Sequence, residues 1–435
     1  MEQPKAVSPE NALRERSSLN GEPSWMLDLR LRSLKHFDQG SVPSWGGDTS
    51  QIPVDDISSY VSQYISREDD ISREDARDNA REAEPTETNE DRDESDAVFH
   101  RNSEELERRG VIFCDMGTAL REYPELVKPY FGRIIPIDDN RFAALNSSVW
   151  SGGTFIYVPP GVRVDQPLQA YFRLSAERMD RFERTLIIAD EGSKVTYIEG
   201  CSAPVYTPDS LRSAVVEIVV KAGAHVTHTT IQNWSANVFN LVTKRAVVEA
   251  EGHIEWIEGN IGSRLTMQYP SVWLAGPKAS GEVLSVAYAG AGQHQDTGAR
   301  MVHAAPETTS KVVAKSVSTN GGRSSFRSSV RVEDGADGCR SRVQCDGLVL
   351  DDDSVFDTYP DEEIAESDAR TAHNATVHKL DRGQLFYLMS RGLTERQAVG
   401  IMVNGFVEPI IRMLPMEYAV EWSRLIELQM EHSVG

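Results

Sequence analysis

The stretch between Gly335 and His373 carries the side chains with the clearest chemistry in this chain. It holds Cys339 and Cys345, then the acidic run Asp351–Asp353, and it ends at the imidazole of His373. Thiolates, imidazoles and carboxylates are the ligands that bind iron and other thiophilic metals. The stretch therefore indicates a metal-related function. The two cysteines do not form a CxxC motif, so two small buried cysteines near a turn are the open alternative.

The composition is typical of a globular protein in a reducing compartment. The 435 residues include only four cysteines, too few for a disulfide scaffold. The sequence has no apolar run of about 18 residues and no apolar signal core at its start, so we expect a cytoplasmic protein without a membrane segment. The net charge of −22, with no basic stripe, argues against a nucleic-acid partner. An acidic, lysine-poor surface also suits a cytoplasm with a high salt concentration.

Composition shifts divide the chain into four regions. We expect a helical, partly disordered acidic region at 1–98, a helical lead-in at 99–142, a core at 143–375 and a helical region at 376–435. Ser24 can cap an early helix, whereas 67–97 is dense in Glu, Asp and Arg and reads as a solvated helix or a disordered linker. Asp115 starts a further helix that Pro124 limits.

From Asn146 to about Tyr359, short runs rich in Val, Ile, Thr and Tyr alternate with Gly, Asp or Ser. These runs predict strands joined by turns, without a helix for some two hundred residues. The strands are expected at Phe155–Val158, Thr185–Ile188, Val195–Ile198, Val215–Val220, Val226–Ile231, Arg245–Val248, Ile254–Ile257, Val283–Ala287, Lys311–Val313 and Leu348–Leu350. A series this long favours a β-solenoid over two sandwiches, although periodicity alone leaves both open.

After Leu380 the pattern becomes helical. Asp381 can cap one helix that Gly392 ends, and Thr394 with Gln397 forms a capping box for the next. Pro415 opens a last helix that is apolar on more than one face. These helices either pack on the end of the solenoid or dock a partner.

Several long strings match one family in order. They are AALNSSVWSGGTFIYVPPGV (Ala143–Val162), FERTLIIADEG (Phe182–Gly192), YIEGCSAPVY (Tyr197–Tyr206), TTIQNWS (Thr229–Ser235), NLVTKRA (Asn240–Ala246), GQHQDTGARMVHAAP (Gly292–Pro306), QLFYLMSRGLTE (Gln384–Glu395) and PMEYAVEWSRLIELQMEHSVG (Pro415–Gly435). Together they resemble the SufB/SufD family of the SUF iron–sulfur cluster assembly machinery. The resemblance covers the chain from about Phe99 to its end, together with the EPSWMLDLRL helix at Glu22–Leu31.

The resemblance implies a mainly β fold, a right-handed parallel β-helix core flanked by helical N- and C-terminal regions. It implies that a second SufB/SufD-type subunit pairs with the β-helix and that the C-terminal helices dock the ABC-type ATPase SufC. It also implies a sulfur donor, cluster acceptor proteins and a transient iron–sulfur cluster. The chain has no Walker A motif, so we expect an assembly protein that is not an enzyme, with ATP hydrolysis in SufC.

The resemblance also implies roles for individual residues. Cys201 matches a cysteine that accepts sulfur, and Cys345 matches a proposed cluster ligand near the subunit interface. His373 matches a histidine near the site of cluster formation. The resemblance further implies that a path for sulfur between the two cysteines is lined by Arg173, Gln232, Trp234 and Lys244. Cationic and amide donors along such a path would stabilise anionic sulfur, and lysine or arginine would lower the pKa of a nearby thiol.

Structural roles are the alternatives for these residues. Cys201, beside Gly200 and Ser202, could be a small packed core residue. Trp234 could belong to the core, and Lys244 could be a surface charge.

The chain departs from the SufB pattern at two matched positions. Asn374 follows His373 where SufB has a glutamate, and Ser175 stands where SufB has an asparagine. Cys345 and the C-terminal strings nevertheless favour a SufB-like scaffold, and a SufD-like structural partner is the alternative. A solenoid hydrolase acting on polysaccharide would need a convergent pair of carboxylates, which we cannot assign here.

Overall fold

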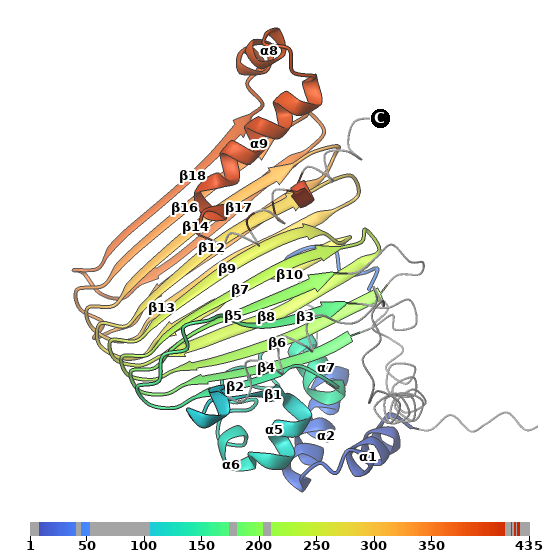
Figure 1. Ribbon diagram of the computed structural model, residues 1–435, viewed down its shortest axis with the longest axis vertical. Helices are drawn as coiled ribbons and strands as arrows, with labels where there is room; N and C mark the ends of the chain where they lie inside the picture. The colour runs from blue at the N-terminus through green and yellow to red at the C-terminus, as the bar shows by residue number, and fades with distance from the viewer. Residues whose placement is uncertain are drawn as a thin grey trace, which may run out of the picture.

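Two sheets of parallel strands form the body of the protein (Figure 1). The computed structural model describes residues 8–40, 45–52, 105–173, 181–202 and 210–413, together with 419, 422 and 424–426. The acidic stretch at 67–97 lies outside the described residues, and so does most of the helix expected from Pro415.

The strands alternate between the two sheets along the chain. The ten-stranded sheet contains, in spatial order, β1 (Ile112–Asp115), β2 (Thr154–Val158), β4 (Arg181–Ala189), β6 (Ser210–Val220), β8 (Val238–Val248), β10 (Leu265–Gln268), β13 (His294–His303), β15 (Arg323–Val332) and β17 (Val355–Ile364), with β11 (Ser271–Leu274) also between β8 and β13. The eight-stranded sheet runs in the order β18 (Arg370–Lys379), β16 (Arg340–Val349), β14 (Thr309–Ser318), β12 (Ser280–Ala289), β9 (His253–Gly262), β7 (His225–Trp234), β5 (Lys194–Ser202) and β3 (Leu168–Arg173). Each turn of the chain therefore adds a strand to both sheets, which confirms the predicted parallel β-solenoid.

Equivalent positions stack in register from one coil to the next. Among the described strands, each pairing is parallel except that of β1 with β2. Side chains alternate between the space enclosed by the sheets and the outside, as the two-residue period of a strand requires. One fully interior ladder of the ten-stranded sheet consists of Ile187, Ile218, Ala246, Val272, Met301 and Val330. Stacked aliphatic side chains of this kind supply the apolar core of the solenoid.

The predicted strands are confirmed, but the predicted first and last residues of the strand region are both wrong. Each predicted run lies within or overlaps an observed strand. At the N-terminal limit, Asn146 belongs to helix α7 (Arg141–Val149), where its amide donates to the carbonyls of Glu183 and Ser213. At the C-terminal limit, β17 and β18 continue the solenoid to Lys379. The prediction ended too early because the side chains of these two strands are largely exposed and lack the apolar runs that marked the earlier strands.

Helices cover the N-terminal end of the solenoid, at the bottom of Figure 1. They are α1 (Pro9–Leu19), α2 (Ser24–Gln39), α5 (Met116–Glu122), α6 (Pro124–Val127) and α7. Their apolar faces share one buried cluster with the first strands of the ten-stranded sheet. The expectation that Ser24 caps α2 is wrong by one residue, because Pro23 is the N-cap and Ser24 begins the helix. Asp115 caps α5 as predicted, accepting a hydrogen bond from the Thr118 amide.

Two helices described over their whole length follow the last strand, at the top of Figure 1, and residues 419, 422 and 424–426 are also helical. Asp381 caps α8 (Arg382–Ser390), and the predicted Thr394–Gln397 capping box begins α9 (Glu395–Ile411). Helix α9 packs on the outer face of the eight-stranded sheet, where Trp422 lies so close to Gly259 that a β-carbon there would be 2.2 Å from the indole. Helix α8 buries none of its side chains. None of the helices in the described ranges is both long and apolar enough to cross a membrane.

A buried ion pair joins the N-terminal helices to the solenoid. Arg184 and Glu217 are 2.8 Å apart and fully buried on adjacent strands. The Glu217 carboxylate also accepts hydrogen bonds from the backbone amides of Gly132, Ile134 and Ile135. It therefore holds the loop before α7 against β6.

We predict that Glu217→Ala lowers the free energy of unfolding by about 3–5 kcal/mol, because it leaves a buried guanidinium unpaired. Urea denaturation followed by circular dichroism measures this change. The control is Glu249→Ala, which removes the partly exposed Lys221–Glu249 pair and is expected to cost less than about 1 kcal/mol. Equal losses for the two variants would contradict the prediction.

Candidate functional site

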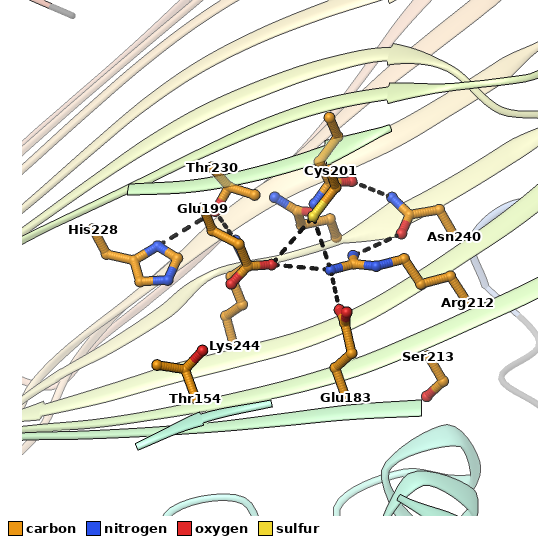
Figure 2. Close-up of polar contacts among 12 residues, drawn as sticks. Thr154, Glu183, Glu199, Cys201, Arg212, Ser213, His228, Thr230, Asn240 and Lys244 are labelled. Atoms are coloured by element: carbon orange, nitrogen blue, oxygen red, sulfur yellow. Dashed lines mark hydrogen bonds and ion pairs between the residues drawn. The ribbon is translucent and has the colours of Figure 1, made fainter. Parts of the chain in front are cut away.

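Polar side chains replace the apolar core over several adjacent coils inside the solenoid (Figure 2). On β5, Glu199 and Cys201 occupy successive interior positions. From the opposite sheet, Glu183 on β4, Arg212 on β6 and Asn240 on β8 point towards them. All five side chains are buried, so their charges interact in a medium of low dielectric constant.

Arg212 is the centre of this group. Its Nη2 lies 2.6 Å from a Glu183 carboxylate oxygen, 3.0 Å from Glu199 Oε1 and 3.4 Å from Cys201 Sγ. Its Nη1 donates to Asn240 Oδ1 over 3.1 Å, and its guanidinium carbon lies 5.1 Å from the centre of the Trp234 ring. Burial lowers the pKa of Arg212, but the negative charges of ionised Cys201, Glu183 and Glu199 raise it by more, so the guanidinium stays charged.

The three acceptors around Arg212 resemble a metal site in composition. Ligand atoms of Glu183, Glu199 and Cys201 all lie within 4.8 Å of one another. The position that a cation would take between them is, however, filled by the Arg212 nitrogen that contacts all three. We therefore interpret the cluster as a carboxylate–guanidinium–thiol network.

Gln232 and Trp234 continue the network into the next coil. Trp234 Nε1 donates to Gln232 Oε1 over 3.1 Å, and the Asn240 amide donates to the same oxygen. Gln232 Nε2 donates in turn to Gln268 Oε1 over 3.1 Å. Trp234 also contacts Cys201 in a small apolar cluster, and a β-carbon on Gly262 would be 1.7 Å from the Trp234 carbonyl oxygen. The indole is thus both a core residue and a member of the network.

Lys244 is a buried charge and not a surface one, since only 2% of its side chain is exposed. Its Nζ lies 3.0 Å from both carboxylate oxygens of Glu258 and 2.6 Å from Thr230 Oγ1. Gln268 donates to the same carboxylate, which links Lys244 to Gln232. Burial raises the pKa of Glu258, and the neighbouring ammonium lowers it in part. Burial and the Lys244 charge lower the pKa of His228, so its imidazole is neutral.

Three of the four residues predicted to form a path are therefore linked to Cys201 by a chain of hydrogen bonds that runs through Arg212 and Asn240. These three are Gln232, Trp234 and Lys244. The fourth, Arg173, ends β3, where its backbone pairs with Ser202 beside Cys201, and its side chain lies outside the described atoms. The cation in contact with the Cys201 sulfur is Arg212, which the sequence analysis did not name.

Cys345 lies in a different environment, several coils away on β16. Its side chain is fully buried in the apolar core. Burial and the neighbouring Asp346 carboxylate raise the pKa of its thiol to about 12. In the single chain this sulfur is therefore a protonated thiol and not a thiolate ready to bind metal.

His373 lies on the adjacent strand β18, paired with Val343, two residues before Cys345. Its side chain is directed to the same side of the sheet, but its hydrogen-bond partner is Ser328 Oγ, at 3.3 Å. Its Nδ1 is 3.7 Å from a carboxylate oxygen of Glu362. The structure thus brings His373 and Cys345 to neighbouring rungs without joining them directly.

The residues that sequence reasoning missed share a recognisable pattern. Glu183, Glu199 and Arg212 are charged residues on strand faces whose other interior positions are mostly apolar. In YIEGCS, the polar residue Glu199 is two positions before Cys201, which places both on one face of a strand. A search for buried charges at this spacing would have identified Glu199, whereas Arg212 comes from the opposite sheet.

The fold and the site define a class: a parallel β-solenoid with a thiol held in a charged internal network. Two family models match the chain. The model described as "SUF system FeS cluster assembly, SufBD core domain" covers residues 172–406, and the "SufBD protein N-terminal region" covers residues 94–170. The chain belongs to the SufBD family of iron–sulfur cluster assembly proteins.

Curated relatives agree with this assignment. An iron–sulfur cluster assembly SufBD family protein of Staphylococcus haemolyticus is 51% identical and aligns with 98% of this chain and 94% of its own length. SufBD family proteins of two Staphylococcus aureus strains, MRSA252 and USA300, show the same identity and coverage. The resemblance found in the sequence is thereby confirmed at the level of the family.

We predict that Cys345 of the folded protein reacts slowly with iodoacetamide at about pH 8, because the thiolate is the reacting form and the pKa of this thiol is about 12. Unfolding in urea restores an ordinary pKa near about 8.5 and is expected to raise the rate more than about tenfold. Peptide mass spectrometry of labelled samples gives the rate for this cysteine separately. Equal rates in the folded and unfolded protein would contradict the expected burial.

Proposed function

We propose that this chain is a SufB-like scaffold subunit that accepts sulfur at Cys201 and takes part in building an iron–sulfur cluster. The observation that carries the proposal is the contact of Cys201 with both a buried carboxylate and a buried guanidinium. A thiol in such a setting can be converted to a nucleophilic thiolate, which is the form that accepts sulfur from a persulfide. A purely structural cysteine needs no charged partners.

The hydrogen bonds beyond Cys201 support a route for sulfur along the solenoid. Gln232, Trp234 and Lys244 present N–H donors inside the protein, on the side of the network that leads towards the later coils. Donors of this kind stabilise an anionic sulfur species and exclude it from bulk water. The path inferred from the resemblance therefore has a physical basis in this chain.

Iron and the nascent cluster, as the cargo of the protein, would meet Cys345 and His373 at the last coils. Metal binding requires the thiol to lose its proton, which the apolar surroundings of Cys345 disfavour in the single chain. Cluster formation at this position therefore requires that the last coils open or that a partner changes their surroundings.

A second SufB/SufD-type subunit would bind at the same end. Both sheets end there in edge strands, β17 and β18, whose side chains are largely exposed. Edge strands offer unpaired backbone groups to another chain, and exposed Tyr359 and Val377 add apolar surface. Docking of this kind would place a partner beside the rungs that hold Cys345 and His373.

Helix α8 provides the surface for a SufC-type ATPase. Phe386 is 73% exposed and Tyr387 is 57% exposed, and α8 buries no side chain. Large exposed aromatic residues on a capped helix are typical of a protein interface. Sulfur donors and cluster acceptors complete the set of partners that we propose.

A SufD-like structural partner is the second candidate. The burial of Cys345 in the apolar core favours it, because such a thiol is a poor metal ligand as it stands. Asn374, the departure from the SufB pattern, lies on the outer side of β18, opposite to His373. The missing carboxylate therefore does not alter the interior around Cys345 in the single chain.

Anaerobic reconstitution with iron and sulfide separates the two candidates. For a scaffold, Cys345→Ser is expected to remove most of the cluster absorbance, whereas Cys201→Ser retains it, because added sulfide bypasses sulfur delivery. Sulfur supplied from a desulfurase and its persulfide carrier is expected to require Cys201 as well. Unchanged absorbance in Cys345→Ser, for the complex with its partner subunit, would favour the SufD-like role.

We predict that Phe386→Asp weakens binding of the SufC-type ATPase by about tenfold or more, because it places a charge at the centre of an apolar contact. Isothermal titration calorimetry with the purified ATPase measures the affinity. Leu19→Asp is the matched control, since Leu19 is 64% exposed on α1 at the opposite end of the solenoid. Equal affinities for Phe386→Asp and the unaltered protein would exclude α8 from the interface.

A further inference from the structure

The sulfur of Cys201 lies between a proton acceptor and a cation. Glu199 Oε1 is 3.4 Å from Sγ, and Arg212 Nη2 is also 3.4 Å from Sγ. The thiol is 2% exposed, so water does not compete for either contact. This is the arrangement of a general base and an anion-stabilising group around one nucleophile.

The Nη2 nitrogen of Arg212 has fewer hydrogens than hydrogen-bond acceptors around it. Nη2 carries two N–H groups, but it has three acceptors, the carboxylates of Glu183 and Glu199 and the sulfur of Cys201. The carboxylate contacts, at 2.6 Å and 3.0 Å, are shorter than the contact to sulfur. While Glu199 is ionised, the neutral thiol is therefore the weakest acceptor and its S–H points to Glu199.

Moving the thiol proton to Glu199 changes this balance. A protonated Glu199 is a weaker acceptor, and a thiolate is a stronger one, so an N–H of Arg212 can turn from the carboxylate to the sulfur. The total charge of the cluster does not change, because the proton moves within it. Ionising Cys201 without such a transfer would leave three anions around one guanidinium in a buried site, which is unfavourable.

We propose that Glu199 accepts the thiol proton of Cys201 and that Arg212 stabilises the resulting thiolate. Glu183 and Asn240 are positioning residues, since they hold the guanidinium in place through Nη2 and Nη1. The inference rests on the proposed role of Cys201 as sulfur acceptor and assigns the groups that activate it.

The sulfur transfer then balances without an outside oxidant. The Cys201 thiolate attacks the terminal sulfur of a persulfide on the donor, a new S–S bond forms on Cys201, and the S–S bond of the donor breaks. The electron pair of the broken bond stays with the donor sulfur, which leaves as a thiolate. That thiolate takes the proton from Glu199, so the donor departs as a thiol and the carboxylate is restored.

Other described side chains lie around this site. Glu183 comes from β4. Tyr197 is on β5 itself, and the uncharged Gln232 of β7 is paired in register with Cys201. Burial and the nearby Glu199 carboxylate raise the pKa of Tyr197 well above its usual value, so this phenol stays neutral. Lys244 is held by Glu258 in the next coils. Among the side chains that the structure describes, the carboxylates of Glu183 and Glu199 and the guanidinium of Arg212 are therefore the charged groups in contact with the thiol or with its partners.

The test uses the full-length reduced protein and two variants, Glu199→Gln and Arg212→Lys. Peptide mass spectrometry measures two rates from about pH 6 to pH 9. One is the rate at which Cys201 reacts with iodoacetamide, and the other is the rate at which it takes up sulfur from glutathione persulfide. We expect Glu199→Gln to lower both rates at about pH 7 by about a hundredfold, with a loss that shrinks as hydroxide replaces the missing base. Arg212→Lys is expected to lower both rates by about tenfold or more, because the thiol pKa rises by about one unit or more.

Matched controls separate activation from damage to the fold. Glu255→Gln changes a half-buried glutamate on the outside of β9, and Arg184→Lys changes a buried arginine on β4. Both controls are expected to react within about twofold of the unaltered protein, with circular dichroism checking the fold of every variant.

The outcomes are distinguishable. If Glu199→Gln reacts as fast as the unaltered protein or faster, Glu199 is only a repulsive neighbour and its role as base is overturned. If Arg212→Lys leaves the pH profile unchanged, its role in stabilising the thiolate is overturned. If Cys201 of the unaltered protein takes up no sulfur, the proposed function fails, while the iodoacetamide profiles still decide the roles of Glu199 and Arg212.

Discussion

In-register stacking of parallel strands is the constraint on which the rest of this structure depends. Because each coil places equivalent positions directly over those of the coil before, polar side chains inside the solenoid find partners on their own strand, on an adjacent coil or on the opposite sheet. Cys201 and Gln232 occupy such equivalent positions on two successive strands of the eight-stranded sheet. The charged residues between the sheets are paired for the same reason, since an unpaired buried charge would cost several kcal/mol.

The two ends of the solenoid differ in a way that matches the proposed roles. At the first coils, helices, an antiparallel β1 and the buried Arg184–Glu217 pair close the core. At the last coils, β17 and β18 leave their edges and most of their side chains exposed, and α8 projects beyond them (Figure 1). The closed end is next to the network around Cys201, for which we propose sulfur acceptance, and the open end carries the exposed surfaces that we propose for partners. The first coils are thus packed against helices, whereas the last coils of the same core leave surface free for the proposed assembly with partners.

Much of the architecture could be predicted from local sequence. Runs of β-branched residues marked the strands, and the helix caps at Asp115, Asp381 and Thr394 were correct because capping depends on residues within one turn. Ser24 failed as a cap because Pro23 ends the preceding extended segment one residue earlier. The last strands were missed because their side chains face solvent, which removes the apolar signal.

The site was harder to predict because its contacts join distant parts of the chain. The resemblance pointed to Cys201, Gln232, Trp234 and Lys244, and the structure connects them in one network. Neither the resemblance nor the local pattern indicated that Arg212, from the opposite sheet, would contact the Cys201 sulfur. Likewise, the apolar surroundings of Cys345 arise from its stacking in register with Ala314 and from the apolar cluster that both sheets form, which a local motif cannot show.

The strand order also sets the distance between Cys201 and Cys345, the two cysteines of the proposed sulfur route. From β5, which carries Cys201, the eight-stranded sheet reaches β16, which carries Cys345, through five strand steps. At about 4.8 Å for each step, the two thiols are separated by about 24 Å along the solenoid. One swing of a persulfide side chain spans only a small part of that length. If Cys201 accepts sulfur and Cys345 meets iron, as proposed, sulfur must therefore leave Cys201 as a detached species, or be relayed by a mobile carrier, before it can join iron at the last coils.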